Sequence, residues 1–80
     1  MAYNGYKNYE TWNVALWLSN NPILYGLTVN FMKSYKGRKP YKDFVKENDF
    51  QYCYTLDDVA LLSSKLSYSQ LNRVMRDFEN

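Results

Sequence analysis

Hydrophobic residues recur along much of the chain at the three- and four-residue spacing of amphipathic helices. The pattern is clearest near the end of the chain, where the apolar positions are Leu71, Val74, Met75 and Phe78. Residues at this spacing lie on one face of a helix, which can be buried against a core. The sequence therefore predicts a last helix there, with Ser67 as its N-cap and Gln70 completing a capping box.

Three earlier segments show similar periodicity between recognisable helix ends. Asn8 has the side chain of an N-cap, and it precedes a predicted helix over Tyr9–Ser19. An Asn-Pro step then begins a second predicted helix, Pro22–Lys36, which Gly37 ends. A third, shorter helix is predicted over Pro40–Asn48. Most of the chain is therefore predicted to consist of helices joined by tight turns.

The segment between the third and last helices is less regular. Asn48–Thr55 is rich in aromatic residues, which suit either a short extended segment or a packed loop. Thr55–Asp58 has the acidic residues typical of the first turn of a helix, and it leads into the apolar residues Val59–Leu62. The predicted fold is therefore all-α, a compact single domain (residues 1–80) of four to five short helices with an N-terminal arm (residues 1–7).

The composition limits the chemistry that the protein can perform. The chain has no histidine, one cysteine and three scattered glycines. Zinc sites, acid–base catalysis near neutral pH and phosphate loops usually need those residue types in larger numbers. The adjacent Asp57 and Asp58 are interpreted as helix-start residues, and Cys53 as a buried apolar residue that no histidine can activate. We therefore expect no enzyme activity, no cofactor and no metal.

The sequence contains no pattern that predicts export or membrane insertion. A lone cysteine forms no internal disulfide, and the N-terminal residues lack the pattern of a secretion signal. No apolar run approaches the roughly 20 residues that span a bilayer. We therefore expect a cytoplasmic protein without a membrane partner.

Positive charge is concentrated in one segment. The net charge of +2 combines an excess of five cations in residues 1–46 with an excess of three anions in residues 47–80. The cations of this segment are Lys33, Lys36, Arg38, Lys39, Lys42 and Lys46. Tyr35 and Tyr41 alternate with them, so the segment is suited to binding phosphates while the tyrosines stack on bases. The same segment also suits an acidic protein surface.

The predicted first helix is apolar on two sides. On a helical wheel, the two apolar arcs contain Tyr9, Trp12, Ala15 and Leu16, and Val14, Trp17 and Leu18. The polar residues in the seams between these arcs are Glu10, Thr11, Asn13, Ser19 and Asn20. Such a helix either lies in the centre of a bundle or uses its second side to bind a partner. Trp17 is therefore either a core residue or an exposed contact.

The same helix carries a recognisable motif, Tyr9–Asn20, with the sequence YETWNVALWLSN. It resembles the opening motif of a family of small uncharacterised proteins carried by bacteriophages, cyanophages among them, and by related mobile elements. The resemblance covers only this early part of the chain. It implies a viral origin and a location in the host cytoplasm, and it implies no particular reaction.

These observations predict a non-enzymatic phage protein that binds a host protein and modulates or inhibits it by steric occlusion. The side chains expected to make contact are Tyr9, Trp17, Lys36, Arg38, Lys39, Tyr41 and Lys42. The alternative is nucleic-acid binding through the basic segment Lys33–Lys46, with an affinity that falls steeply with salt. Self-association into a homodimer through the second apolar side of the first helix is compatible with either function.

Overall fold

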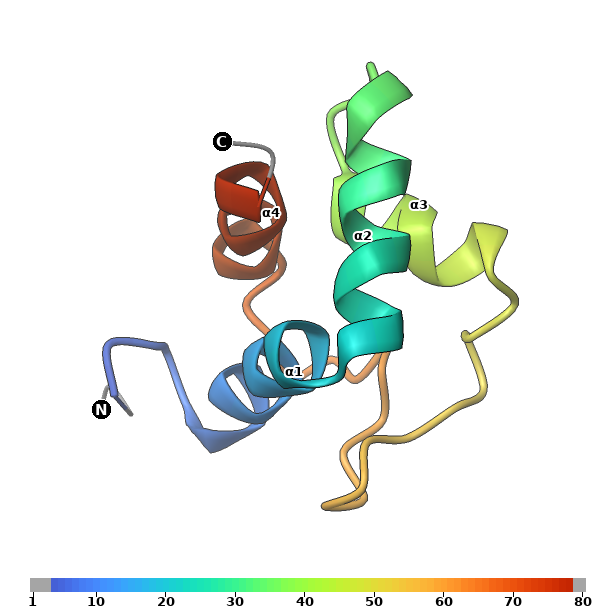
Figure 1. Ribbon diagram of the computed structural model, residues 1–80. Helices are drawn as coiled ribbons and strands as arrows, with labels where there is room; N and C mark the ends of the chain where they lie inside the picture. The colour runs from blue at the N-terminus through green and yellow to red at the C-terminus, as the bar shows by residue number, and fades with distance from the viewer. Residues whose placement is uncertain (1–3, 79–80) are drawn as a thin grey trace.

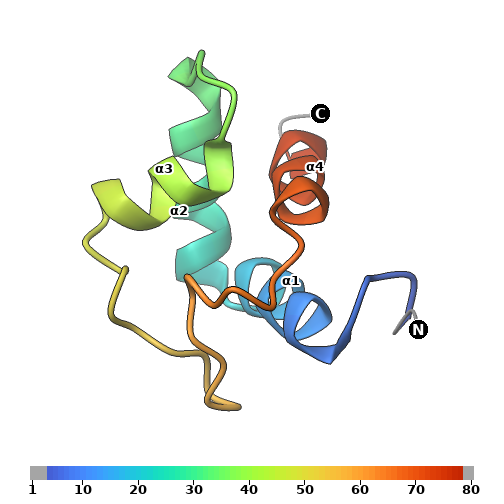
Figure 2. The same ribbon diagram turned by 180° about the vertical axis from the view of Figure 1, so that it is seen from behind.

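The computed structural model describes residues 4–78, and within them the chain forms four helices and no β-strand. The helices are α1 (Tyr9–Asn20), α2 (Pro22–Ser34), α3 (Pro40–Glu47) and α4 (Tyr68–Phe78). In Figure 1, α2 and α4 stand side by side and α1 lies across their lower ends. Figure 2 shows α3 crossing α2, with its first residues beside α4. The all-α fold predicted from the sequence is confirmed.

The first two helices begin where their capping residues predict. Asn8 Oδ1 accepts a hydrogen bond from Thr11 N at 2.9 Å, which satisfies one of the free amides at the start of α1. Asn21 Oδ1 accepts from two amides in the first turn of α2 at 3.0 and 3.2 Å, and Pro22 occupies the first helical position. The main difference is that α2 ends at Ser34, two residues earlier than predicted.

All four helices and the connection before α4 contribute to the core. Its largest fully buried side chains are Tyr41, Phe44, Leu18, Met32, Leu61, Leu71 and Met75. The hydroxyl of Tyr41 donates to the carbonyl of Leu61 at 2.6 Å, so its polar group is satisfied inside the core. Burial raises the pKa of Tyr41 far above its ordinary value, and the side chain is therefore neutral at physiological pH.

The helix predicted to begin at Thr55 is wrong, because residues 55–59 form a tight turn. Thr55 N donates to Val59 O at 2.9 Å, and Asp58 N donates to Thr55 O at 2.9 Å. The residues that flank this turn form an isolated antiparallel bridge. Asp58 has a φ of +70°, a left-handed conformation that interrupts a helix and that Asp tolerates better than most residues. The acidic pair therefore belongs to a turn.

The connection from α3 to this turn is irregular. The sequence does not decide whether Asn48–Thr55 is a strand or a loop. In the structure it is a loop, and within it only Tyr54 takes part in a β-bridge. Phe50 supplies a partly buried side chain that packs against the core. Cys53 is exposed, so the prediction that it is buried is wrong: the loop directs Phe50 inward and leaves the thiol in solvent.

The start of α4 is bound to the residues that precede α1. Ser67 Oγ accepts from Gln70 N at 3.4 Å, which is one half of the predicted capping box. Gln70 Oε1 accepts from Lys7 N at 2.7 Å and does not complete the box. The predicted N-terminal arm is therefore attached to the body at Lys7, while residues 1–3 lie outside the part of the chain that the structure describes.

Candidate functional site

The start of the Tyr9–Asn20 motif holds the connection that precedes α4. Thr11 is fully buried, and its hydroxyl donates to Asn8 Oδ1 at 2.6 Å and accepts from Ser67 N at 3.0 Å. The side-chain amide of Asn8 donates to Lys65 O at 2.7 Å. The helical wheel places Thr11 in a seam between the two apolar arcs, and in the structure this position is buried. The Thr11 hydroxyl can be buried there because it is hydrogen-bonded, in part to a backbone amide of the connection.

Asn13, in the middle of α1, fixes the 55–59 turn. It is only 5% exposed; its amide donates to Asp57 Oδ2 at 2.6 Å and its carbonyl oxygen accepts from Thr55 Oγ1 at 2.5 Å. Thr55 Oγ1 in turn accepts from Val59 N at 3.2 Å. A buried side-chain amide with both its donor and its acceptor in use therefore holds the turn against α1.

The 55–59 turn, α1 and the start of α2 surround a hollow of about 510 Å³, which we call the Trp17 groove. Its apolar lining comes from Leu16, Trp17, Pro22, Tyr54 and Leu56. Leu56 projects from the turn and is 101% exposed, and Tyr54 is 60% exposed. A fully exposed leucine beside a hollow lined by aromatic rings is typical of a contact surface.

Trp17 is neither fully buried nor fully exposed. Its ring packs edge-on against Phe50, with centroids 6.0 Å apart and an interplanar angle of 78°. The indole belongs to the partly buried shell around the core and also lines the groove. Trp17 therefore contributes to the edge of the core and also lines the groove, while its role as a contact stays a prediction.

Trp12 lies in a different environment on the α4 side of α1. It lines a separate hollow of about 230 Å³ together with Val74 and Phe78 from α4. Tyr9 pairs with Trp12 at a centroid distance of 5.7 Å and does not line the Trp17 groove. The two tryptophans therefore occupy different sides of α1, in agreement with the helical wheel, and Tyr9 belongs with Trp12.

Tyr35 holds the basic loop between α2 and α3 in a fixed conformation. Its hydroxyl donates to Asp43 Oδ2 at 2.5 Å and accepts from Lys39 N at 3.0 Å. Its ring stacks on Phe31 with centroids 4.9 Å apart. A Cβ on Gly37 would lie 2.3 Å from Tyr35 Oη, so a side chain at this position would displace the Tyr35 ring. The loop is therefore held by ring stacking, side-chain bonds and a close backbone approach.

Exposed cations gather around this loop at what we call the basic end: Lys36, Arg38, Lys39 and Lys42, with Arg76 from α4. Lys42 Nζ lies 5.0 Å from the centre of the Tyr68 ring, a cation–π arrangement. Desolvation raises the pKa of Tyr35, and the charge of Arg76 acts in the opposite direction. Arg76 is therefore close enough to the loop to contribute to its potential.

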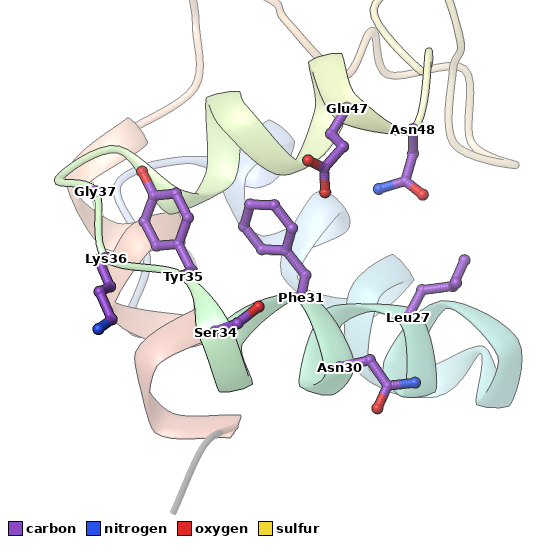
Figure 3. Close-up of a pocket in the computed structure, with 9 residues that line it drawn as sticks. All are labelled: Leu27, Asn30, Phe31, Ser34, Tyr35, Lys36, Gly37, Glu47 and Asn48. Carbon is purple, nitrogen blue, oxygen red and sulfur yellow. The ribbon is translucent and has the colours of Figure 1, made fainter.

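A further hollow, of about 540 Å³, lies between α2, the basic loop and the C-terminal end of α3. Figure 3 shows Phe31 at its centre with the Glu47 carboxylate directed toward the ring, while Lys36 lies beyond Tyr35. Two aromatic rings thus separate the acidic side chain from the cationic one. Because its charged groups do not converge, this hollow favours no particular ligand.

The predicted contact residues do not form one surface. Trp17 lies beside the start of α2, whereas the loop with Lys36, Arg38 and Lys39 follows the other end of α2 (Figure 1). The 13 residues of α2 span about 20 Å, so the two surfaces are separate. Tyr41, predicted as a contact, is fully buried, and that prediction is wrong because Tyr41 shares the inward face of α3 with Phe44 and Val45.

Sequence reasoning missed several residues of these surfaces, among them Tyr54, Leu56 and Arg76. Leu56 precedes two aspartates, and interpreting that tripeptide as a turn would have placed it at an exposed tip. Arg76 follows the buried Met75 on α4, but no sequence signal places it beside a loop from residues 35–39.

Metal-binding and membrane-spanning features were sought in the described residues. Within residues 4–78, no group of three or more His, Cys, Asp or Glu side chains is arranged to hold a metal ion. In the same range, no helix combines the length and the apolar character needed to cross a bilayer.

Comparison with known proteins gives one match. A model described as a family of unknown function, DUF7249, matches residues 1–78, and the chain therefore belongs to that family. No curated protein and no solved structure matches the chain.

Proposed function

We propose that this member of the DUF7249 family is a non-enzymatic phage protein that binds a host protein through the Trp17 groove and modulates it by steric occlusion. The observation that carries the proposal is the fully exposed Leu56 beside a groove lined by Trp17. The resemblance of Tyr9–Asn20 to a phage motif supports a viral origin and action in the host cytoplasm.

The groove has the composition of a protein-binding hot spot. Tryptophan and tyrosine are enriched among the residues that dominate interface energies, and Trp17 and Tyr54 both line this groove. Leu56 exposes its whole side chain, and burial of a leucine side chain is worth about 1.5–3 kcal/mol. The apolar centre is bordered by the carboxylate of Asp57, which suits the polar rim of an interface.

The groove is also held in place before any partner binds. The 55–59 turn is fixed by Asn13, so little conformational entropy is lost when Leu56 is buried in a complex. We therefore expect the partner to present an apolar side chain that enters the groove, with polar groups around it. Binding of this kind acts by covering a surface of the partner and requires no catalytic group.

The proposal is tested by affinity capture from a lysate of a bacterium infected by phages that carry the motif, with nuclease present. Leu56→Asp is the test variant, because removing an exposed side chain leaves the core unchanged and shifts stability by about 0.5 kcal/mol or less. Ser64→Asp is the matched control, since it adds the same charge at an exposed position outside the groove.

We expect one protein to be captured by the natural chain and by the Ser64→Asp variant, and to be lost with Leu56→Asp. Equal capture by all three chains would show that the contact lies elsewhere. Light scattering on the purified protein separates the predicted homodimer from a host complex. A dimer that Leu56→Asp dissociates would assign the groove to a second copy of this chain and contradict the proposal.

A further inference from the structure

We propose that the basic end is a second binding site, independent of the Trp17 groove, that contacts the phosphate backbone of double-stranded nucleic acid. The two sites lie at opposite ends of α2, about 20 Å apart, so one can be occupied without the other.

The cations are mounted on a loop that is already ordered. Tyr35 bonds to Asp43 and to Lys39 N, and its ring passes so close to Gly37 that a side chain there would clash. Lys36 and Arg38 flank the glycine in this fixed loop and are exposed. The ordered backbone keeps these cations near one another, so little backbone entropy is lost when phosphates bind.

The neighbouring helices extend the positive surface. Lys42 and Lys46 are four residues apart, a spacing that places them on one face of α3, and Lys39 directly precedes this helix; all three are exposed. Arg73 and Arg76 are three residues apart on α4, and both are exposed. Arg76 also contributes to the electrostatic potential at Tyr35.

Two carboxylates, Asp43 and Glu47, lie near the basic end and offset part of its charge, but its five exposed cations outnumber them. Asp43 accepts a hydrogen bond from the Tyr35 hydroxyl. Glu47 lies on the side of the Figure 3 hollow, directed toward Phe31 and away from Lys36. The cations of the loop therefore face solvent together.

Among the described residues, the basic loop, α3 and α4 expose no large hydrophobic side chain, and the apolar side chains nearest to Lys36 are Leu27 and Phe31 of α2, which line the neighbouring hollow. In the described residues, the exposed large hydrophobic side chains are Tyr9, Ile23, Tyr25, Leu27, Tyr52, Tyr54 and Leu56. None of these belongs to the basic loop, to α3 or to α4. Protein interfaces and membrane-surface contacts depend on such anchors, whereas phosphate contacts depend on charge alone.

The tyrosines of the basic segment are also unavailable for stacking on unpaired bases. Tyr41 is buried, and Tyr35 is stacked on Phe31. Lys42 covers the ring of Tyr68. Proteins that bind single strands stack bases on free aromatic rings. Because these rings already have partners, we expect the segment to contact the phosphate backbone of a duplex and not unpaired bases.

The test is fluorescence anisotropy with a labelled DNA duplex of arbitrary sequence, titrated with the full chain at several salt concentrations. Contacts from Lys36, Arg38, Lys39, Lys42 and Arg76 predict a slope of log K against log salt of about −4 to −5. The double variant Arg38→Gln/Lys39→Gln removes about one phosphate contact per cation. It should therefore reduce the magnitude of this slope by about 2 and weaken binding at least tenfold.

The control is Lys7→Gln/Lys65→Gln, which removes the same charge from exposed positions outside the basic end. This control and Leu56→Asp should both bind the duplex within about twofold of the natural chain, because neither changes a phosphate contact. If both double variants weakened duplex binding equally, the affinity would depend on net charge alone, and the proposal would be overturned.

Two further probes distinguish the ligand class. A single strand of the same sequence that binds more tightly than the duplex would overturn the proposal in favour of base stacking. A polyglutamate chain of matched charge that competes as well as the duplex would overturn it in favour of an acidic protein surface. We expect the duplex to bind at least tenfold more tightly than either probe.

Discussion

Replacing Asn13 with alanine should destabilise the protein more than any other change of a polar residue on α1. Asn13 is almost completely buried and makes two side-chain hydrogen bonds, at 2.6 Å to Asp57 and at 2.5 Å from Thr55. The variant loses both bonds and leaves the hydroxyl of Thr55, itself only 6% exposed, without its acceptor. The 55–59 turn then loses its attachment to α1.

The expected cost follows from these two bonds. A bond to a charged acceptor contributes about 1.5–3 kcal/mol, and the lower end applies because Asp57 is exposed and can be solvated by water. The bond from Thr55 contributes about 1 kcal/mol, and a buried donor left without a partner costs about as much again. The total is about 3.5 kcal/mol, which lowers the melting temperature of a domain of this size by about 14–28 °C.

The assay is urea unfolding followed by far-ultraviolet circular dichroism, with Asn20→Ala as the control. Asn20 is an exposed residue of the same helix, and its replacement should change the free energy of unfolding by about 0.5 kcal/mol or less. A double-mutant cycle with Thr55→Val isolates the Asn13–Thr55 pair and should give a coupling energy of about 1 kcal/mol. A cost for Asn13→Ala no greater than that of the control would refute the role assigned to this side chain.

Three other variants test separate parts of the structure. Gly37→Ala should lower the melting temperature by about 5 °C and weaken duplex binding, because the new Cβ displaces the Tyr35 hydroxyl from its two bonds. Asn21→Ala should cost about 1 kcal/mol in urea unfolding, since it removes the cap of α2. Tyr41→Phe should cost about 1–3 kcal/mol by leaving the Leu61 carbonyl without its donor. Burial raises the pKa of Tyr41, so the folded protein keeps the phenol proton at pH values where the unfolded chain loses it. The stability of the natural chain therefore falls as the pH rises above about 10. The Tyr41→Phe variant has no proton to lose at this position, so its stability should fall less over that range.

The helices could be predicted from the sequence because their ends are specified locally. Asn8, Asn21 and Pro22 act within a few residues of their own positions, and no distant group is needed to begin α1 or α2. The apolar stripe of α4 is likewise a local periodicity, and its Leu71 and Met75 are fully buried.

The 55–59 turn could not be predicted because its determinant is distant. Thr55 and Asp57 followed by apolar residues fit a helix start as well as a turn. The choice is made by Asn13, which lies 42 residues from Thr55 along the chain. The same long-range contact exposes Leu56, and no local pattern reports that exposure.

The candidate surfaces were predicted only in part, because they too depend on contacts between distant parts of the chain. The helical wheel indicated that α1 has two apolar sides, and the Trp17 groove lies on one of them. Tyr41 was misplaced because its position among cations suggests a surface, while its spacing from Phe44 and Val45 on α3 puts it in the core. Burial depends here on which face of a short helix meets its neighbours.

Photo-crosslinking from position 56 tests the central claim most directly. A photoreactive phenylalanine analogue in place of the exposed Leu56 leaves the core unchanged, and the same analogue in place of Ser64 serves as the control. In nuclease-treated host lysate, the account predicts one discrete covalent adduct from position 56 that is absent from position 64. No adduct from position 56, or the same adducts from both positions, would contradict the claim that the Trp17 groove binds a protein.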